Sequence, residues 1–577
     1  MASVGETPHG VGIVAPSGGI TVEPQPAIED HALIGDLHTA ALVAKDGSID
    51  FLCLPDFDSG SCFTSLLGTP ENGRWKIAPV RPVRSVTRRY RGESLILETE
   101  LETDEGRVRL IDFMPIRRGA PRVVRIVEGV AGQVTLHFEL QPRFAYGLTV
   151  PRESSRDSTS SAVAGPDALY LRGGRRGAPP FHTEITVVAG QRVAYELAWS
   201  RPYNDVPPPL DIEAALRDTE AFWKQWTSRI KLPAEYPDIV MRSLITIKAC
   251  TYRPNGAIVA APTFGLPETP GGERNWDYRF TWIRDSVLAL NALMAAGLTA
   301  EAGHFGEWLT TAIGGAIGQF QIMYGIRGER ILTEIDLPWL GGHGNARPVR
   351  IGNGAYTQFQ LDVLGELAAV MYTFANLHGR LNDTGRDGMR SIAQIVREVW
   401  QNEDHGIWEM RGPTRSFTAS KVAAWTAIDR WVKLIDQFQL EDDIHPWEQL
   451  RAQIAAEILA KGFDAKRNTF TQYYGSANVD ASLLAIPLSG FLPATDPRVV
   501  GTVKAIEEEL IEDGLVLRYR TDMSDDGLTG EEGVFLACSF WLVSTYQMMG
   551  RADDAHRLFE RAISIANDVG LLAEEYL

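Results

Sequence analysis

The spacing of apolar residues changes partway along this chain of 577 residues, and the change limits the folds that it can adopt. Up to about Ser200, apolar and polar residues alternate in short runs such as 134–140 and 193–199, with turn sequences such as 104–106 between them. Alternation with a period of two is typical of strands that bury one face. From about Tyr236 the period becomes 3.6, which is typical of amphipathic helices. The sequence therefore predicts an antiparallel β-sandwich followed by a helical domain.

The change of period also predicts the domains. Residues 1–27 are expected to form a flexible tail, 28–205 the sandwich, 206–235 a linker with a helix at 212–226, and 236–577 the helical domain. Helical patterns in the last segment occur near 237–252, 285–297, 301–314, 357–379, 387–400, 418–437, 445–462, 478–485, 498–511, 534–549 and 552–567. Their spacing indicates helical hairpins in a six-hairpin toroid. Such a ring needs twelve helices, and because eleven patterns are found, the last helix is expected to be missing.

Charge, cysteine content and hydropathy argue against several classes of protein. A net charge of −18 and a pI near 5.2 disfavour nucleic acid or an anionic membrane surface as partners. Four cysteines do not make a disulfide framework in so long a chain, so a reduced, cytoplasmic protein is expected. No apolar run reaches the length of a membrane span, and no secretion signal is found. Because the histidines and cysteines lack metal-ligand spacing, no metal and no cofactor are expected.

Residues 274–286 are unusually rich in groups that bind sugars. They contain three arginines, two aspartates, two tryptophans, a tyrosine and a phenylalanine, and an apolar helical pattern follows them. Sugar C–H faces stack on indole rings, and sugar hydroxyls bind carboxylate and guanidinium groups. The alternative is a structural cluster of salt bridges at a helix N-terminus. Loop 336–356 is also polar, aromatic and rich in glycine, and Trp339, Arg347 and Arg350 are its predicted substrate contacts.

Three loop carboxylates are candidates for acid–base catalysis. Glu409 follows Trp408, and a carboxyl group packed on an indole has a raised pKa, as a general acid requires. Glu532 precedes an apolar helix, where it could instead stabilise the helix N-terminus. Glu574 lies near the end of the sequence, where a solvated residue is the alternative. Since neither a phosphate loop nor a serine-nucleophile motif is found, these groups suit glycoside hydrolysis by two carboxylates.

Several motifs resemble those of the bacterial trehalase- and glucoamylase-like members of glycoside hydrolase family 15. In chain order they lie at 34–36, 46–50, 55–59, 275–286, 347–353, 360–362, 406–411 and 532–541. The resemblance runs from about Ile28 to the end of the sequence. It implies an N-terminal β-sandwich, an (α/α)6 barrel and an inverting mechanism.

The resemblance also implies roles for individual residues. Tyr278, Trp282, Arg284 and Asp285 match a motif that holds the terminal glucose, and Arg518 with Tyr519 matches a substrate-binding pair. Glu409 is implied as the general acid and Glu574 as the general base, with Glu532 as the fallback base and a substrate contact. The complete set of predicted contacts is Tyr278, Trp282, Arg284, Asp285, Trp339, Arg347, Arg350, Trp408, Arg518, Tyr519 and Glu532.

Two departures from the family pattern affect these expectations. Many fungal relatives have an acidic residue after the general acid, where this chain has Met410, so the pKa of the acid or the acceptor subsite is expected to differ. The family normally continues with a glycine-rich segment and a final helix beyond the motif of Glu574. This departure agrees with the count of eleven helical patterns, and it bears on whether the chain is active.

Three functions remain open from the sequence. An inverting exo-hydrolase of a small α-glucoside is favoured, with trehalose ahead of isomaltose or malto-oligosaccharides. The lack of a secretion signal argues against granular starch as the substrate and so favours a small α-glucoside. A phosphorylase on a similar toroid is the second, since the arginines of loop 336–356 could bind phosphate. A glycan-binding protein with impaired catalysis is the third, and the missing helix favours it. The sequence does not reveal the oligomeric state.

Overall fold

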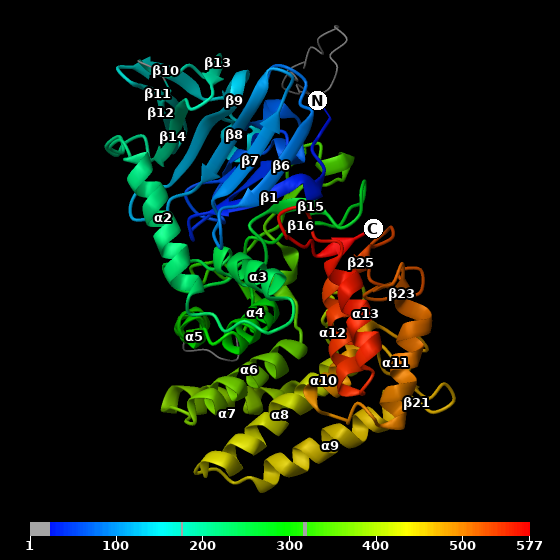
Figure 1. The fold of residues 1–577 in the computed structure, drawn as a ribbon. Coiled ribbons are helices and arrows are strands. Elements are labelled where there is room, and N and C mark those ends of the chain that lie inside the picture. Colours follow the sequence, from blue (N-terminus) through cyan, green and yellow to red (C-terminus); the bar gives the residue numbers. More distant parts are fainter. Residues whose placement is uncertain (1–23, 175–176, 315–319) are drawn as a thin grey trace, which may run out of the picture.

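The computed structural model describes residues 24–174, 177–314 and 320–577, in which an antiparallel β domain precedes a helical domain, as predicted (Figure 1). Its strands are β1 His31–Gly35, β2 Ala40–Ala44, β3 Ser48–Cys53, β4 Ser61–Phe63, β5 Arg74–Pro79, β6 Ser85–Tyr90, β7 Leu97–Glu102, β8 Gly106–Phe113, β9 Arg122–Gln141, β10 Arg152–Arg156, β11 Thr159–Ala164, β12 Asp167–Gly173, β13 His182–Val188 and β14 Arg192–Ser200. Residues 1–23 of the predicted tail lie outside the described part. The Gln25 side chain donates to the carbonyl oxygens of Leu66 and Gly68, so the chain packs on the β domain from there.

The long strand β9 joins the two sheets of this domain. Its first half pairs with β8 and β14, and its second half pairs with β5 and β13. The change of sheet falls at Gly129 and Gly132, where a Cβ atom would lie 2.1 Å from the oxygen of Val188 or 2.2 Å from that of Glu105. Glycine is therefore required at both positions, because any side chain there would collide with neighbouring backbone.

The predicted linker helix is α2, Ile212–Thr227, and it contacts both domains. Asp211 caps its N-terminus by accepting a hydrogen bond from Ala214 N. Ala215 and Leu216 pack on the β domain in a cluster that includes Phe113, while Trp226 donates to Glu301 of α5 at 2.9 Å. The helix therefore packs against both domains and connects the helical domain to the sheets.

Eleven helices follow Tyr236 in the described part of the chain, and each overlaps a predicted helical pattern. They are α3 Pro237–Ala249, α4 Ile283–Ala295, α5 Thr299–Ile313, α6 Asp362–His378, α7 Asp383–Val399, α8 Thr418–Phe438, α9 His445–Lys461, α10 Ala485–Ser489, α11 Pro497–Leu510, α12 Leu536–Met548 and α13 Ala552–Ile563. Helices α4, α6, α8, α10 and α12 contact one another in that order and form a curved inner layer (Figure 1). Helices α5, α7, α9 and α13 each pack against the preceding inner helix, as in a ring of hairpins.

A small apolar cluster, separate from the main core, fastens the two domains together. Phe51, Cys53, Leu66 and Leu67 of the β domain contribute to it, with Phe264, Leu337, Leu340 and Val349 from loops of the helical domain. All eight side chains are buried, so their contact holds these loops in fixed positions beside the β domain. All four cysteines are free and buried. In the part of the chain that the structure describes, no helix has the length and apolar character needed to cross a membrane.

Candidate active site

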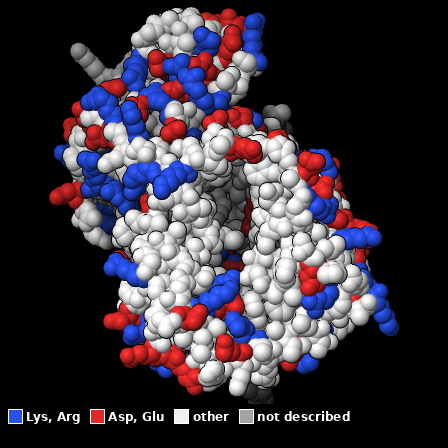
Figure 2. Space-filling model, turned by 60° about the horizontal axis from the view of Figure 1, so that its bottom comes forward, with Lys and Arg blue, Asp and Glu red and all other residues white. Residues whose placement is uncertain are grey.

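Side chains of several loops meet in one pocket at the N-terminal ends of the inner helices. Loop 262–284 leads into α4, residues 353–361 into α6, loop 404–416 into α8 and loop 517–533 into α12. The cavity has a volume of about 950 Å³, including its open mouth. It is lined by Glu268, Arg274, Trp276, Tyr278, Trp282, Arg284, Asp285, Leu288, Asn353, Ala355, Ile407, Trp408, Glu409, Met410, Arg411, Arg518, Tyr519, Asp526, Leu528, Glu532, Phe535, Ala537, Trp541 and Glu574. Figure 2 shows a hollow in the molecule whose walls are mostly uncharged and whose depth is acidic.

Glu409 is held in this pocket by two donors. Trp282 Nε1 and Arg284 Nη2 both donate to its Oε1, at 2.8 and 2.9 Å. Its backbone is left-handed, with a φ of 57°, in a turn closed by a bond from Glu409 N to Gly406 O. Burial raises the pKa of Glu409, although the charge of Arg284 acts in the opposite direction. Because both donors use Oε1, a proton on this carboxyl group belongs on Oε2.

Arg284 connects Glu409 to the helix behind it. Its Nη1 donates to Gln360 Oε1 at 2.8 Å and to Asp362 Oδ2 at 3.1 Å, at the start of α6. The neighbouring Asp285 also lines the pocket, and burial raises its pKa. Arg284 therefore fixes the position of Glu409, whereas the Asp285 carboxyl group lines the pocket.

Glu574 and Glu575 face different surroundings because they stand in extended backbone. Strand β26, Glu575–Tyr576, pairs with β25, Val534–Phe535, directly before α12. Successive side chains of an extended segment point to opposite faces. Glu574 accordingly reaches the pocket, while Glu575 lies 2.7 Å from Arg518. The Glu574 side chain is exposed at the pocket. Its pKa is nevertheless raised to about 8, first because the protein around it displaces solvent and second because of the negative charge of Glu268.

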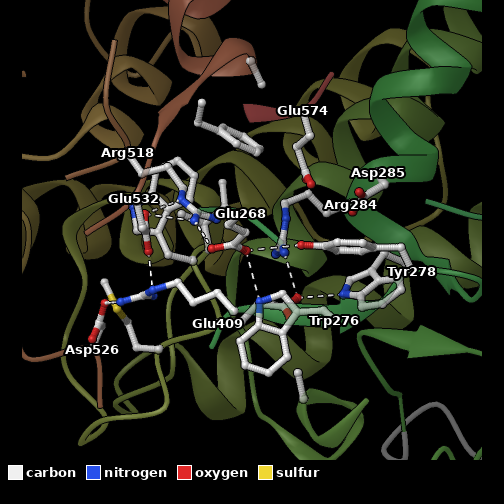
Figure 3. A pocket seen from close by; sticks show the side chains of 18 of the residues that line it. Glu268, Trp276, Tyr278, Arg284, Asp285, Glu409, Arg518, Asp526, Glu532 and Glu574 are labelled. Atoms are coloured by element: carbon white, nitrogen blue, oxygen red, sulfur yellow. Dashed lines mark hydrogen bonds and ion pairs between the residues drawn. The ribbon is translucent and has the colours of Figure 1, made fainter. Parts of the chain in front are cut away.

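Arg518 lies among three other carboxylates, and Figure 3 shows two of them, Glu268 and Glu532. Its Nη2 lies 2.8 Å from Glu268, 2.9 Å from Glu532 and 2.7 Å from Glu575. The oxygens of these carboxylates lie within 4.8 Å of one another, close enough for a metal ion, but Arg518 supplies the positive charge among them. Glu532 is thus committed to ion pairs, whereas among the described residues Glu574 makes none.

A further network extends from Glu532 along the pocket wall. Arg274 Nη1 lies 2.6 Å from Glu532, and its Nη2 donates to Asp526 at 2.8 Å. Tyr519 Oη lies 2.9 Å from the same Asp526 oxygen and 3.0 Å from Glu532. These buried groups hold one another in place, so this wall is rigid before any ligand binds.

Trp408 supplies an aromatic face beside Glu409. Its Nε1 donates to buried Asp480 at 2.9 Å, and its ring centroid lies 5.9 Å from that of Trp541 and 6.4 Å from that of Tyr519. Burial raises the pKa of Asp480 to about 6. The indole is therefore held at its nitrogen and by neighbouring rings, and it lines the pocket.

Eight of the eleven predicted contacts line the pocket, together with both predicted catalytic residues, and three contacts do not. Trp339 donates to Tyr146 O of the β domain at 2.9 Å, and Arg347 donates to Gly341 O within its own loop at 3.1 Å. Arg350 donates to Glu273 O at 2.7 Å, behind the pocket wall. Loop 336–356 therefore serves mainly the contact between the domains.

Eight polar or aromatic residues of the pocket were absent from the predicted contacts: Glu268, Arg274, Trp276, Asn353, Arg411, Asp526, Phe535 and Trp541. Arg274 and Trp276 belong to the stretch recognised as sugar-binding, and Arg411 closes the motif of the predicted acid, so the signal was present. Glu268 sits between two prolines in an irregular loop, and nothing in its neighbours marks it.

Comparison with known proteins places these observations in a family. Residues 234–576 match the family described as glycosyl hydrolases family 15, and residues 20–172 match a trehalase-like N-terminal domain. A trehalase of Mycolicibacterium smegmatis is 38% identical, with 96% of this chain and 87% of that protein covered. A trehalase of Thermoplasma volcanium is 34% identical, with 96% and 90% covered. A crystal structure of a bacterial glucoamylase complexed with acarbose shares the fold at 12% identity, with a TM-score of 0.69 over 97% of this chain and 91% of that one. The chain therefore belongs to family 15 of the glycosyl hydrolases, and it is a glycosidase with an N-terminal β domain and an (α/α)6-type helical domain.

Proposed function

We propose that the chain is an inverting, exo-acting hydrolase that releases β-glucose from a small α-glucoside, with trehalose favoured. The observation that carries the proposal is the presence of Glu409 and Glu574 in one pocket. Among the described residues Glu574 makes no ion pair, and the ion pair of Glu409 with Arg284 orients its carboxyl group. The similarity to proteins named trehalase, over nearly the whole chain, supports trehalose. Isomaltose and malto-oligosaccharides are the competing substrates. A cytoplasmic location stays a prediction from the cysteine content.

Glu409 acts as the general acid in this proposal. Its raised pKa favours the protonated form, and the proton on Oε2 is transferred to the glycosidic oxygen as the bond to the leaving sugar breaks. The two donors on Oε1 stabilise the carboxylate that forms. Trp282 and Arg284 thus contribute to the step without exchanging protons themselves.

Glu574 acts as the general base on the opposite side of the glucose ring. It accepts a proton from a water molecule whose oxygen bonds to the anomeric carbon, so the configuration at that carbon inverts. The carboxylate form of Glu574 and the protonated form of Glu409 are required together. Because the pKa of Glu574 is raised to about 8, activity is expected to increase with pH as Glu574 ionises and to fall where Glu409 loses its proton. The raised proton affinity of Glu574 also makes it a stronger base once ionised.

The phosphorylase alternative depended on arginines of loop 336–356. Arg347 and Arg350 do not line the pocket. The arginines that line it are each paired with a carboxylate: Arg274, Arg284, Arg411 and Arg518. No observation on these residues favours phosphate over water as the nucleophile, so hydrolysis is preferred.

The test measures glucose release from trehalose, isomaltose and maltotriose, with the first anomer followed by proton NMR. We expect β-glucose to appear first from isomaltose or maltotriose where these are cleaved, and equal amounts of α- and β-glucose from trehalose, because its leaving glucose keeps the α configuration. Glu409→Gln and Glu574→Gln should each lower kcat by about 10²–10⁴-fold, the usual contribution of acid–base groups. Early release of α-glucose alone, or unchanged activity of both variants, would contradict the proposal. The matched control is Glu575→Gln, which removes the adjacent carboxylate and leaves Glu574 in place.

A further inference from the structure

We infer that Arg411 recognises the leaving sugar, in an acceptor half of the pocket that fits a single sugar ring. The inference rests on the proposed function, because it takes Glu409 as the acid at the bond that is cleaved. It concerns a residue that closes the motif of the predicted acid at 406–411 but was not among the predicted contacts.

The pocket has two sides, and the labelled side chains show them (Figure 3). Arg284, Asp285 and Glu574 gather on one side, Asp526 and Glu532 lie on the other, and Glu268 lies between them. The ring that is attacked from Glu574 must occupy the first side. The leaving sugar, joined through the oxygen that Glu409 protonates, must therefore extend toward the second side, and we define this as the acceptor half.

Arg411 is fixed over one wall of the acceptor half. Its Cζ lies 4.1 Å from the centre of the Trp276 ring, close enough for a strong cation–π contact. Its Nη1 and Nη2 donate to the two oxygens of Glu334, at 3.1 and 2.8 Å. Trp276 is itself held by a bond from its Nε1 to Glu268 at 3.0 Å. The guanidinium group is therefore oriented before a sugar arrives, so little conformational entropy is lost on binding.

Arg411 also keeps a donor for a ligand. Among the described residues its Nε has no hydrogen-bond partner, and its side chain remains 29% exposed while lining the pocket. The other two arginines on this side are both paired with carboxylates. Arg274 is only 4% exposed and is paired with Asp526 and Glu532. Arg518 is paired with Glu268, Glu532 and Glu575. Arg411 is thus the accessible cation of the acceptor half, and guanidinium groups bind sugar hydroxyls well.

The outer wall of the acceptor half is closed by loops that bind one another. Arg411 N donates to Asp526 O at 2.8 Å, and a Cβ atom on Gly412 would lie 2.4 Å from Asp525 O, so loops 404–416 and 517–533 touch backbone to backbone. Thr529 N and Oγ1 both donate to Glu273 at 2.7 Å, which fastens loop 262–284 to the same wall. These contacts fasten the loops together behind Arg411, and the inference that the acceptor half takes a single sugar ring rests on this wall.

The experiment compares two substrates that share the glucose to be released. One is the disaccharide that is hydrolysed fastest among trehalose, isomaltose and maltose; the other is α-glucosyl fluoride, whose leaving group is not a sugar. We expect Arg411→Ala to lower kcat/KM for the disaccharide by about 10- to 100-fold, the effect of losing one charged hydrogen bond. Fluoride release should change by less than about threefold, because no acceptor ring is present.

The matched control is Arg350→Ala. Arg350 contacts the same Trp276 ring, at 4.8 Å, and lies 3.6 Å from the same Glu334, but it does not line the pocket. It should leave the ratio of the two kcat/KM values unchanged. Equal losses with both substrates in Arg411→Ala, or no loss with either, would overturn the inference. So would a wild-type protein that releases fluoride but cleaves no disaccharide, or that cleaves maltotriose as well as maltose. A wild-type protein inactive on every substrate would overturn the proposed function itself.

Discussion

Loops 262–284 and 336–356 contain the same kinds of residue and make different contacts. Both combine tryptophan, arginine, glycine and acidic residues. The first places Trp276 and Tyr278 in the pocket, whereas in the second Trp339 binds the β domain and Arg347 binds its own loop. The residue types that bind sugars are therefore also those that fasten one domain to another.

The difference lies in the apolar residues between the polar ones. Loop 336–356 contributes three buried side chains, Leu337, Leu340 and Val349, to the cluster that joins the domains. Loop 262–284 contributes only Phe264, and its buried Arg279 binds Ser59 O of the β domain, so it is anchored at two points. The stretch around those anchors remains available to line the pocket. A polar loop with regular apolar positions is thus a docking loop, and one without them is the better candidate for a site.

The largest effect is expected from the pocket loop, in Arg284→Ala. The substitution removes a donor from Glu409 and leaves Asp362 without its ion pair. We expect kcat/KM for the glucoside to fall by about 10²–10³-fold, as for the loss of one preorganised donor. Steady-state kinetics measure it, and a loss below tenfold would show that Trp282 alone can orient Glu409.

Leu340→Ala should have the largest effect in the docking loop, on stability instead of chemistry. Leu340 is 1% exposed in the cluster between the domains. Its truncation should lower the free energy of unfolding by about 2–5 kcal/mol, measured in a urea titration. At temperatures where the variant is folded, kcat should stay within about threefold of the wild type. A large loss of kcat in folded protein would mean that this loop also shapes the pocket.

Glu268→Gln tests the electrostatics of the pocket loop. The charge of Glu268 is the largest electrostatic contribution to the raised pKa of Glu574, after burial. Removing that charge lowers the pKa of Glu574, so the acidic limb of the kcat/KM profile should move to lower pH, on the order of one pH unit. Asp336→Asn, which removes a carboxylate from the docking loop, is the control and should leave the limb in place. An unmoved limb in Glu268→Gln would indicate that another group titrates there.

The smallest effect is expected from Arg347→Ala. Among the residues that the structure describes, its side chain donates one hydrogen bond, to Gly341 O, and it is exposed. Both kcat/KM and the melting temperature should change little, since isolated surface contacts contribute less than about 1 kcal/mol. A drop in kcat/KM comparable to that of Arg284→Ala would abolish the distinction between the two loops.

The regular elements were the easiest to predict from the sequence. A pattern at 418–437 became α8, Thr418–Phe438, because its buried face repeats over nearly six turns. The predicted start of α6 was five residues early, since Gly354–Thr357 forms a separate 3-10 turn. Two-residue strands such as β26 gave no signal, because a period cannot be detected in two residues. Glu268 was missed for a related reason: its position depends on contacts with Arg518, 250 residues away.

The left-handed backbone at Glu409 has a consequence for how this protein can change. A side chain in that conformation raises the energy of the folded state by roughly 1 kcal/mol or more, and only glycine adopts it without strain. Selection for stability alone would therefore favour glycine at the very position that supplies the acid. Stability and activity therefore favour different residues at position 409, within the turn from Gly406 to Met410.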